Sequence, residues 1–158
     1  MTANDWTGWL LASPVAEFIT GNAWVWPCLE ITHFFSLCLL FGSLAIVDLR
    51  LAGLGPPLSD RVGQLLVRTA IAAFCVNALT GSLFFTANAP KYIGNSAFEL
   101  KLALIALAGL NAALYHWRFR PVVSTGQTVM LAQLSGVTSL LIWSGVIVCG
   151  RMITFYAP

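Results

Sequence analysis

Residues 24–47 read WVWPCLEITHFFSLCLLFGSLAIV, and this stretch decides the fold. Its only acidic or basic side chains are Glu30 and His33. A helix needs about 20 mostly apolar residues to cross a hydrocarbon core of roughly 30 Å. Three later stretches have the same character, at about residues 62–85, 98–117 and 129–149. The sequence therefore predicts four transmembrane helices.

The composition of the whole chain points to the same class of protein. Hydrophobic residues make up 58% of the chain and charged residues only 9%, whereas a soluble domain has roughly 25% charged residues. These values exclude a soluble enzyme, and we expect an all-α integral membrane protein with a single membrane domain over residues 1–158. The basic residues are dispersed, so nucleic acid is not an expected partner.

Short connections rich in glycine and proline separate the four spans, which predicts an up-down four-helix bundle in the lipid bilayer. Lys and Arg accumulate on the cytoplasmic side of a membrane. Five arginines adjoin the first and third connections, namely Arg50, Arg61, Arg68, Arg118 and Arg120. The other side has three basic residues, namely Lys91, Lys101 and Arg151. We therefore expect both termini outside the cytoplasm.

Residues from about 5 to 20 are too few to span a membrane. They include Trp6, Trp9 and Phe18, and tryptophan favours the level of the lipid headgroups. We expect this segment to form one amphipathic helix on the outer leaflet.

Ionisable side chains inside a span are costly and are read as functional by default. Glu30 and His33 lie three positions apart and so share one helix face. At about 1.5 Å per residue, Glu30 and His33 lie about 9 Å and 14 Å below the outer boundary. In the third span Lys101 lies about 5 Å and His116 about 27 Å below it. Glu30 and Lys101 are thus close enough in level to pair.

The two histidines differ in depth by about 13 Å, which disfavours a haem held by both within one monomer. Three haem arrangements remain: His33 with a ligand such as Lys101, His33 with its copy across a two-fold dimer, or separate haems near each leaflet. Alternatively, His33 is a buried neutral imidazole bonded to Glu30 or to a neighbouring helix, and His116 is an interfacial residue.

Several further residues are candidates for the same site. Arginine suits the bidentate binding of a carboxylate, so Arg151 could bind Glu30 or a haem propionate. Arg50 could bind a propionate at the other boundary, or could form with Asp48 an ion pair that closes the bundle. Copper is a further alternative, with His33 as ligand and Cys28, Cys149 and Met152 as soft partners.

No nucleophile triad, phosphate-binding loop or dinucleotide fingerprint occurs in the sequence, and the four cysteines lack a CxxC spacing. A non-catalytic protein is therefore expected, rather than an autonomous enzyme.

The sequence resembles an uncharacterised family of bacterial four-helix inner-membrane proteins. The resemblance rests on five stretches of sequence. They are Trp26-Pro27-x-x-Glu30-x-x-His33, Leu39-Leu40-Phe41-Gly42-Ser43, Asp48-Leu49-Arg50-Leu51, Lys101-Leu102-Ala103-Leu104 leading to Asn111 and His116, and Gly150-Arg151-Met152-Ile153. More distantly, the architecture is similar to the copper-resistance CopD membrane domain and to cytochrome b561-type proteins. These relatives bind haem or copper through histidine, although the two level-matched histidine pairs of the b561 pattern are missing here. The resemblance implies a multi-pass protein of the bacterial inner membrane. In that membrane, the distribution of Lys and Arg predicts both termini in the periplasm.

From residues and resemblance together, we expect a cytochrome-like protein or redox-complex subunit that holds haem b near the outer leaflet. His33 would be its axial ligand, with Glu30, Lys101 and Arg151 as orienting or charge-balancing groups. The alternatives are a cofactor-free structural or assembly subunit and a copper-handling membrane protein. A homo-oligomer or a larger membrane complex is the expected assembly.

Overall fold

The computed structural model describes residues 3–55, 57–119 and 130–156, and within these ranges the ordered elements are all helices. Four of them have the length and hydropathy to cross a membrane. They are α3 (Val25–Leu51), α4 (Asp60–Ala87), α6 (Ser96–Leu114) and α8 (Met130–Met152). The predicted all-α bundle of four membrane helices is confirmed. The predicted third connection, at residues 120–129, lies outside the described residues.

The helices differ from the predicted spans mainly at their ends. A π-helix, η1 (Tyr115–Phe119), continues α6, and α3, α4 and α8 each extend two or more residues past their predicted carboxyl ends. Helix α4 begins where the Ser59 hydroxyl accepts a hydrogen bond from the Val62 amide. This cap explains a start two residues before the predicted one.

The amino-terminal segment is two helices, α1 (Ala3–Leu11) and α2 (Pro14–Gly21), so the prediction of one helix over residues 5–20 is wrong. Proline has no amide hydrogen to continue a helix but is well suited to begin one. Pro14 therefore starts a new helix, and the Ser13 hydroxyl caps it by accepting from the Ala16 amide. Trp9 and Phe18 are exposed on these helices, as an interfacial segment requires.

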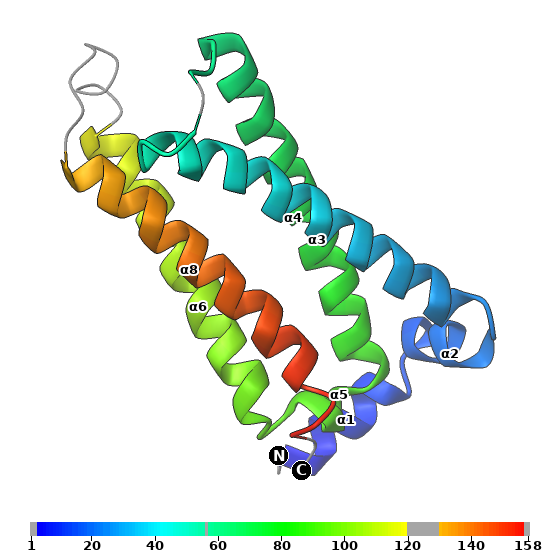
Figure 1. Ribbon diagram of the computed structural model, residues 1–158. Helices are drawn as coiled ribbons and strands as arrows, with labels where there is room; N and C mark the ends of the chain where they lie inside the picture. The colour runs from blue at the N-terminus through cyan, green and yellow to red at the C-terminus, as the bar shows by residue number, and fades with distance from the viewer. Residues whose placement is uncertain (1–2, 56, 120–129, 157–158) are drawn as a thin grey trace.

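The four long helices form two antiparallel pairs, as Figure 1 shows. Helix α3 packs mainly against α4, and α6 against α8. The pairs meet where α3 contacts α8, at the end of the molecule that contains the α3–α4 turn. Helices α4 and α6 have little backbone contact in the described part of the chain. The short helix α5 (Ala89–Tyr92) and helix α1 lie at the opposite end, beside the start of α6.

A small core joins three of the helices. Leu40 of α3 packs with Ala70 and Ala73 of α4, and Trp143 of α8 lies against this cluster. The Trp143 ring also meets the ring of Phe74 edge-on, with 6.2 Å between the centroids. Small residues allow helix backbones to approach closely where lipid supplies no hydrophobic drive for packing.

The closest approach of α3 and α8 occurs at Gly136. A Cβ atom placed there would lie 2.6 Å from the Asp48 carbonyl oxygen and 3.0 Å from Leu51 Cβ. Glycine is therefore required at position 136, because any side chain would push the two helix pairs apart.

Asn95 holds the end of α8 to the start of α6. Its side-chain oxygen caps α6 by accepting from the amides of Ala97 and Phe98. Its amide nitrogen donates to the Ile153 carbonyl oxygen over 3.1 Å, and the residue is fully buried. Gly94 precedes it with φ of +71°, a conformation that side chains other than glycine rarely adopt. This turn fixes the two helices at one level.

Gly136→Ala should destabilise the bundle by about 1–3 kcal/mol, because the new methyl group clashes with the backbone of α3. Gly109→Ala is the matched control, since a Cβ there meets nothing within 4 Å. Thermal unfolding in detergent, followed by circular dichroism, measures both. Equal melting temperatures for the two variants would contradict the close α3–α8 contact.

Candidate functional site

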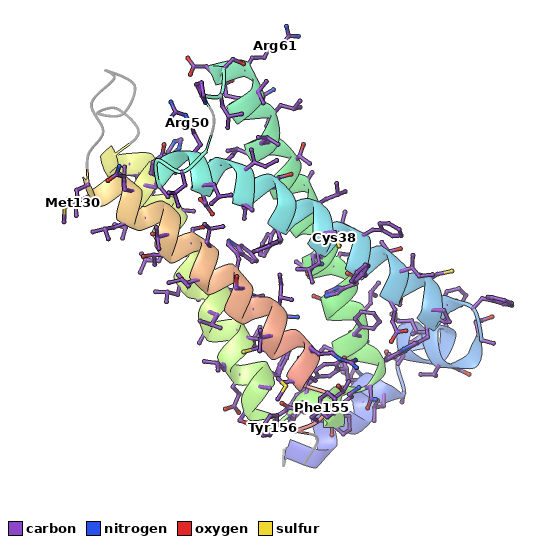
Figure 2. The ribbon with its side chains drawn as sticks, in the orientation of Figure 1. Cys38, Arg50, Arg61, Met130, Phe155 and Tyr156 are labelled. Carbon is purple, nitrogen blue, oxygen red and sulfur yellow. The ribbon has the colours of Figure 1, made fainter. Side chains whose placement is uncertain are left out.

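The structure separates the predicted cofactor residues into two groups at opposite ends of the bundle. Glu30, His33, Lys101 and Arg151 belong to the end near α5, whereas Arg50 and His116 belong to the end near the α3–α4 turn. Arg50 and Tyr156 mark these two ends in Figure 2. One compact site can therefore include members of only one group.

His33 is bound to α4 by a hydrogen bond between its Nδ1 atom and the Thr80 hydroxyl, at 2.7 Å. The residue is half-buried, and the Phe84 ring packs edge-on against the imidazole with 5.5 Å between centroids. A Cβ at Gly81 would lie only 3.7 Å from His33 Cε1. Residues on two successive turns of α4 thus fix the orientation of this ring.

A second polar contact lies one turn deeper between the same helices. The Asn77 side-chain amide donates to the His33 carbonyl oxygen at 2.8 Å and to the Ser36 hydroxyl at 2.9 Å. The Ser36 hydroxyl also donates to the His33 carbonyl oxygen. His33, Ser36, Asn77 and Thr80 form a continuous polar cluster, which we call the His33 cluster.

The Thr80 hydroxyl lies between the His33 ring and the backbone of its own helix. The carbonyl oxygens of Val76 and Asn77 lie 2.9 Å and 3.1 Å from it as acceptors. If the hydroxyl donates to one of these carbonyl oxygens, it accepts from Nδ1–H of His33, and Nε2 then has the free lone pair. In the described part of the chain no hydrogen bond reaches Nε2.

Lys101 approaches the His33 cluster from the other helix pair. Its ammonium lies against the backbone of α8, where a Cβ at Gly150 would be 3.3 Å from Nζ. It is half-buried and interacts electrostatically with both His33 and Cys149. Three of the four long helices therefore contribute to this region through His33, Thr80 and Lys101, and α8 supports Lys101.

Glu30 and Arg151 have other partners than expected. The Glu30 carboxylate is exposed and accepts from Trp26 Nε1 at 3.0 Å, one turn earlier on its own helix. The Arg151 guanidinium is exposed and lies 5.5 Å from the centre of the Phe155 ring. The structure thus orients His33 through Thr80 rather than through Glu30, and it places Arg151 at the rim.

Aromatic rings close the bundle beyond this site. The rings of Phe85 and Phe98 stack at 5.9 Å between α4 and α6, and Tyr92 packs on Phe98 at 5.1 Å. Trp6 of α1 stacks on the other side of Phe85. Burial raises the pKa of Tyr92 above its ordinary 10.0, and the negative charge of Glu30 raises it further.

At the opposite end, Asp48 is buried but does not form the predicted ion pair with Arg50. Its Oδ2 atom has no hydrogen-bond partner among the described residues, and Ser139 of α8 interacts with the carboxyl group. Arg50 is exposed, and so is His116 in η1. These two candidates face away from the packed interior.

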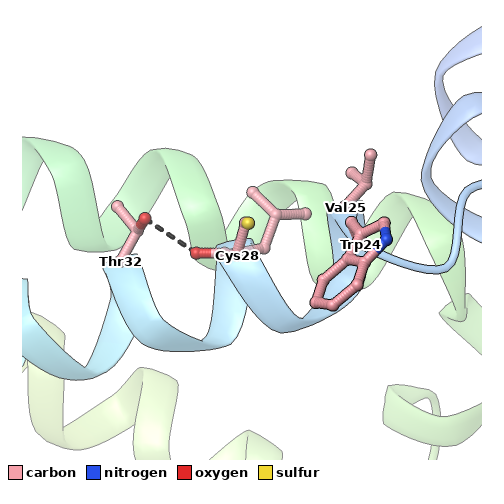
Figure 3. A pocket seen from close by; sticks show the side chains of 5 residues that line it. Trp24, Val25, Cys28 and Thr32 are labelled. Atoms are coloured by element: carbon pink, nitrogen blue, oxygen red, sulfur yellow. Dashed lines mark hydrogen bonds between the residues drawn. The ribbon is translucent and has the colours of Figure 1, made fainter.

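Two of the predicted copper ligands, Cys28 and Cys149, lie in different surroundings. Cys28 is exposed and Cys149 is buried in α8. Cys28 lines a shallow groove of about 250 Å³ on the outward side of α3, with Trp24, Val25, Leu29 and Thr32 (Figure 3). The groove does not include His33. Across the described ranges, no group of three or more His, Cys, Asp or Glu side chains could hold a metal ion.

Comparisons with protein-family models, with curated proteins and with solved structures found no match. They provide no link to the CopD or b561 families.

Thr80→Val should destabilise the protein by about 1 kcal/mol, because it leaves Nδ1 of His33 without its partner in an apolar region. Thr86→Val is the matched control, since the Thr86 hydroxyl bonds only the Ser82 carbonyl of its own helix. The melting temperature of each variant is measured in detergent. Equal melting temperatures for the two variants would refute the His33–Thr80 interaction.

Alkaline pH should destabilise the fold through Tyr92. Its pKa is raised in the folded protein, so above pH 10 the unfolded chain loses the phenolic proton more readily and the free energy of unfolding falls. Tyr92→Phe should remove this part of the pH dependence, whereas Tyr156→Phe, at an exposed site, should retain it. Chemical unfolding at a series of pH values measures the effect. An unchanged alkaline slope in Tyr92→Phe would argue against a buried phenol.

Proposed function

We propose that the protein is a membrane-embedded electron carrier that binds haem b through His33 near the end of the bundle that contains α5. One observation supports this proposal above the others. Nδ1 of His33 bonds Thr80, and no hydrogen bond from the described residues reaches Nε2, so that Nε2 is available to coordinate a metal. A histidine that coordinates a metal almost always has its other nitrogen bound in this way, because that bond sets the tautomer and the ring orientation.

The residues around His33 suit haem better than copper. A haem needs one or two axial ligands, apolar surroundings and cations near its propionates. Nε2 of His33 is one such ligand, the Phe84 ring supplies apolar surface, and Lys101 supplies either a cation or a second ligand. A copper site would need several soft side chains around His33, but Cys28 is exposed in a groove whose lining does not include His33.

The roles of the protein side chains follow from their contacts. Haem b bound to His33 would supply one-electron redox chemistry. Thr80 keeps the proton on Nδ1, so that Nε2 stays available for coordination. Lys101 offsets negative charge from its place on the α8 backbone at Gly150. The rings of Phe85, Tyr92 and Phe98 separate this region from water at the end of the bundle.

We also propose a location in a bacterial inner membrane with both termini in the periplasm. The exposed arginines Arg50, Arg61 and Arg68 lie at the α3–α4 end, which the positive-inside rule assigns to the cytoplasm. The haem would then lie near the periplasmic leaflet. Such a carrier needs donor and acceptor proteins, and we propose that it acts as a homo-oligomer or as a subunit of a larger membrane complex.

The absorption spectrum of the protein tests the proposal. Wild-type protein, expressed with haem supplied and purified in detergent, should show a Soret band and a redox difference spectrum. His33→Ala should lose at least about tenfold in haem occupancy, because it removes the axial ligand. His116→Ala, at the opposite end of the bundle, is the control and should retain the spectrum. A colourless wild-type protein would refute haem binding.

A cofactor-free assembly subunit is the second candidate. The observation that favours it is that polar side chains join the long helices in pairs. Between α6 and α8, for example, the Asn111 amide donates to the Ser135 carbonyl oxygen, and the Ser135 hydroxyl donates to Asn111 Oδ1. On this alternative, His33→Ala would lower assembly or yield, and wild-type protein would be colourless.

A further inference from the structure

A hollow flanked by two arginines lies near the start of α4, far from the His33 cluster. It is lined by Arg61, Gln64, Leu65 and Arg68 and has a volume of about 310 Å³. The spacing of three, four and seven residues places these side chains on one face of the helix. A hollow of this size is at the lower limit of small-ligand pockets, which span roughly 300–1,000 Å³.

The two arginines of this hollow have no carboxylate partner in the part of the chain that the structure describes. Both are exposed, and within residues 3–55, 57–119 and 130–156 neither forms an ion pair with a carboxylate. Arg61 projects from the free end of α4, away from the other helices (Figure 2). The hollow therefore presents two guanidinium groups and one amide to its surroundings.

The depth of the hollow in the membrane identifies those surroundings. Helix α4 ends at Ala87, beside the aromatic rings at the opposite interface. Counted from Ala87, Arg68 lies about 28 Å and Arg61 about 39 Å along the helix. The hydrocarbon core is roughly 30 Å thick. Arg68 thus lies at the hydrocarbon boundary and Arg61 beyond it, so that the hollow lies at the level of the lipid phosphates.

We propose that this hollow binds the headgroup phosphate of an anionic phospholipid. Arginine donates paired hydrogen bonds to phosphate oxygens, so Arg61 and Arg68 hold the phosphate from two sides and Gln64 donates a further bond. Leu65 is 62% exposed in the same hollow and contacts the acyl chain. An apolar side chain between two arginines favours a lipid over free phosphate. This site does not depend on the proposed haem function.

Native mass spectrometry of the detergent-purified full-length chain tests the site, with palmitoyl-oleoyl phosphatidylglycerol as the probe. Wild-type protein should bind this lipid in preference to palmitoyl-oleoyl phosphatidylcholine. Arg61→Gln/Arg68→Gln should weaken binding by about tenfold or more, because charge-assisted hydrogen bonds are lost. The single variants Arg61→Gln and Arg68→Gln should each weaken it by a smaller factor. All four positions of the hollow are on a helix surface, and circular dichroism checks that the variants fold.

Arg50→Gln is the matched control, because it removes one exposed arginine from the same end of the bundle without touching the hollow. It should bind phosphatidylglycerol as wild type does. Three results would overturn the proposal: unchanged binding in the double variant, an equal loss in Arg50→Gln, or displacement of the lipid by an equal concentration of inorganic phosphate.

Discussion

Polar side chains within a bilayer must find their hydrogen-bond partners inside the protein, because the hydrocarbon offers none. In this bundle that constraint decides which helices are neighbours. His33 and Ser36 of α3 find Thr80 and Asn77 on α4, and Asn111 of α6 finds Ser135 on α8. Each helix pair thus has its own polar contact between its two helices. The two pairs are joined differently, through the close approach of backbones at Gly136 at one end and through the stacked rings of Phe85 and Phe98 at the other.

The same constraint gives the His33 cluster its chemical character. The Thr80 hydroxyl lies within hydrogen-bond distance of both the Val76 carbonyl oxygen of its own helix and Nδ1 of His33. The imidazole is therefore held in one orientation by α4, while its other nitrogen remains unbonded within the described chain. Lys101, supported at Gly150, brings a positive charge from the second helix pair. A fixed imidazole with a free nitrogen is what a coordinated metal needs from a histidine, and this is why haem binding is the function that we propose.

Hydropathy predicted the four spans, and the short connections predicted their antiparallel order, since long apolar runs and turn residues are visible in any single sequence. The partners of His33 were not predicted. Asn77 and Thr80 are uncharged, and such residues are common in membrane helices, so nothing in their spacing singles them out before α3 and α4 are placed together. Glu30 seemed the natural partner because it shares the face of His33, but its carboxylate instead bonds Trp26. Asn95 did have a visible signal, since an asparagine before Ser-Ala-Phe-Glu is typical of a helix cap; its bond to Ile153 depends on the tertiary fold.

The tautomer of His33 is the most direct measure of this arrangement. Nitrogen-15 NMR of histidine-labelled protein, purified without haem and compared with His116→Ala to assign the signals, distinguishes a protonated Nδ1 from a protonated Nε2. The hydrogen bond to Thr80 predicts a proton on Nδ1 and a bare Nε2, and it predicts that Thr80→Val abolishes this preference. A proton on Nε2 in the wild-type protein would contradict the arrangement, because Nε2 would then have no lone pair for a metal.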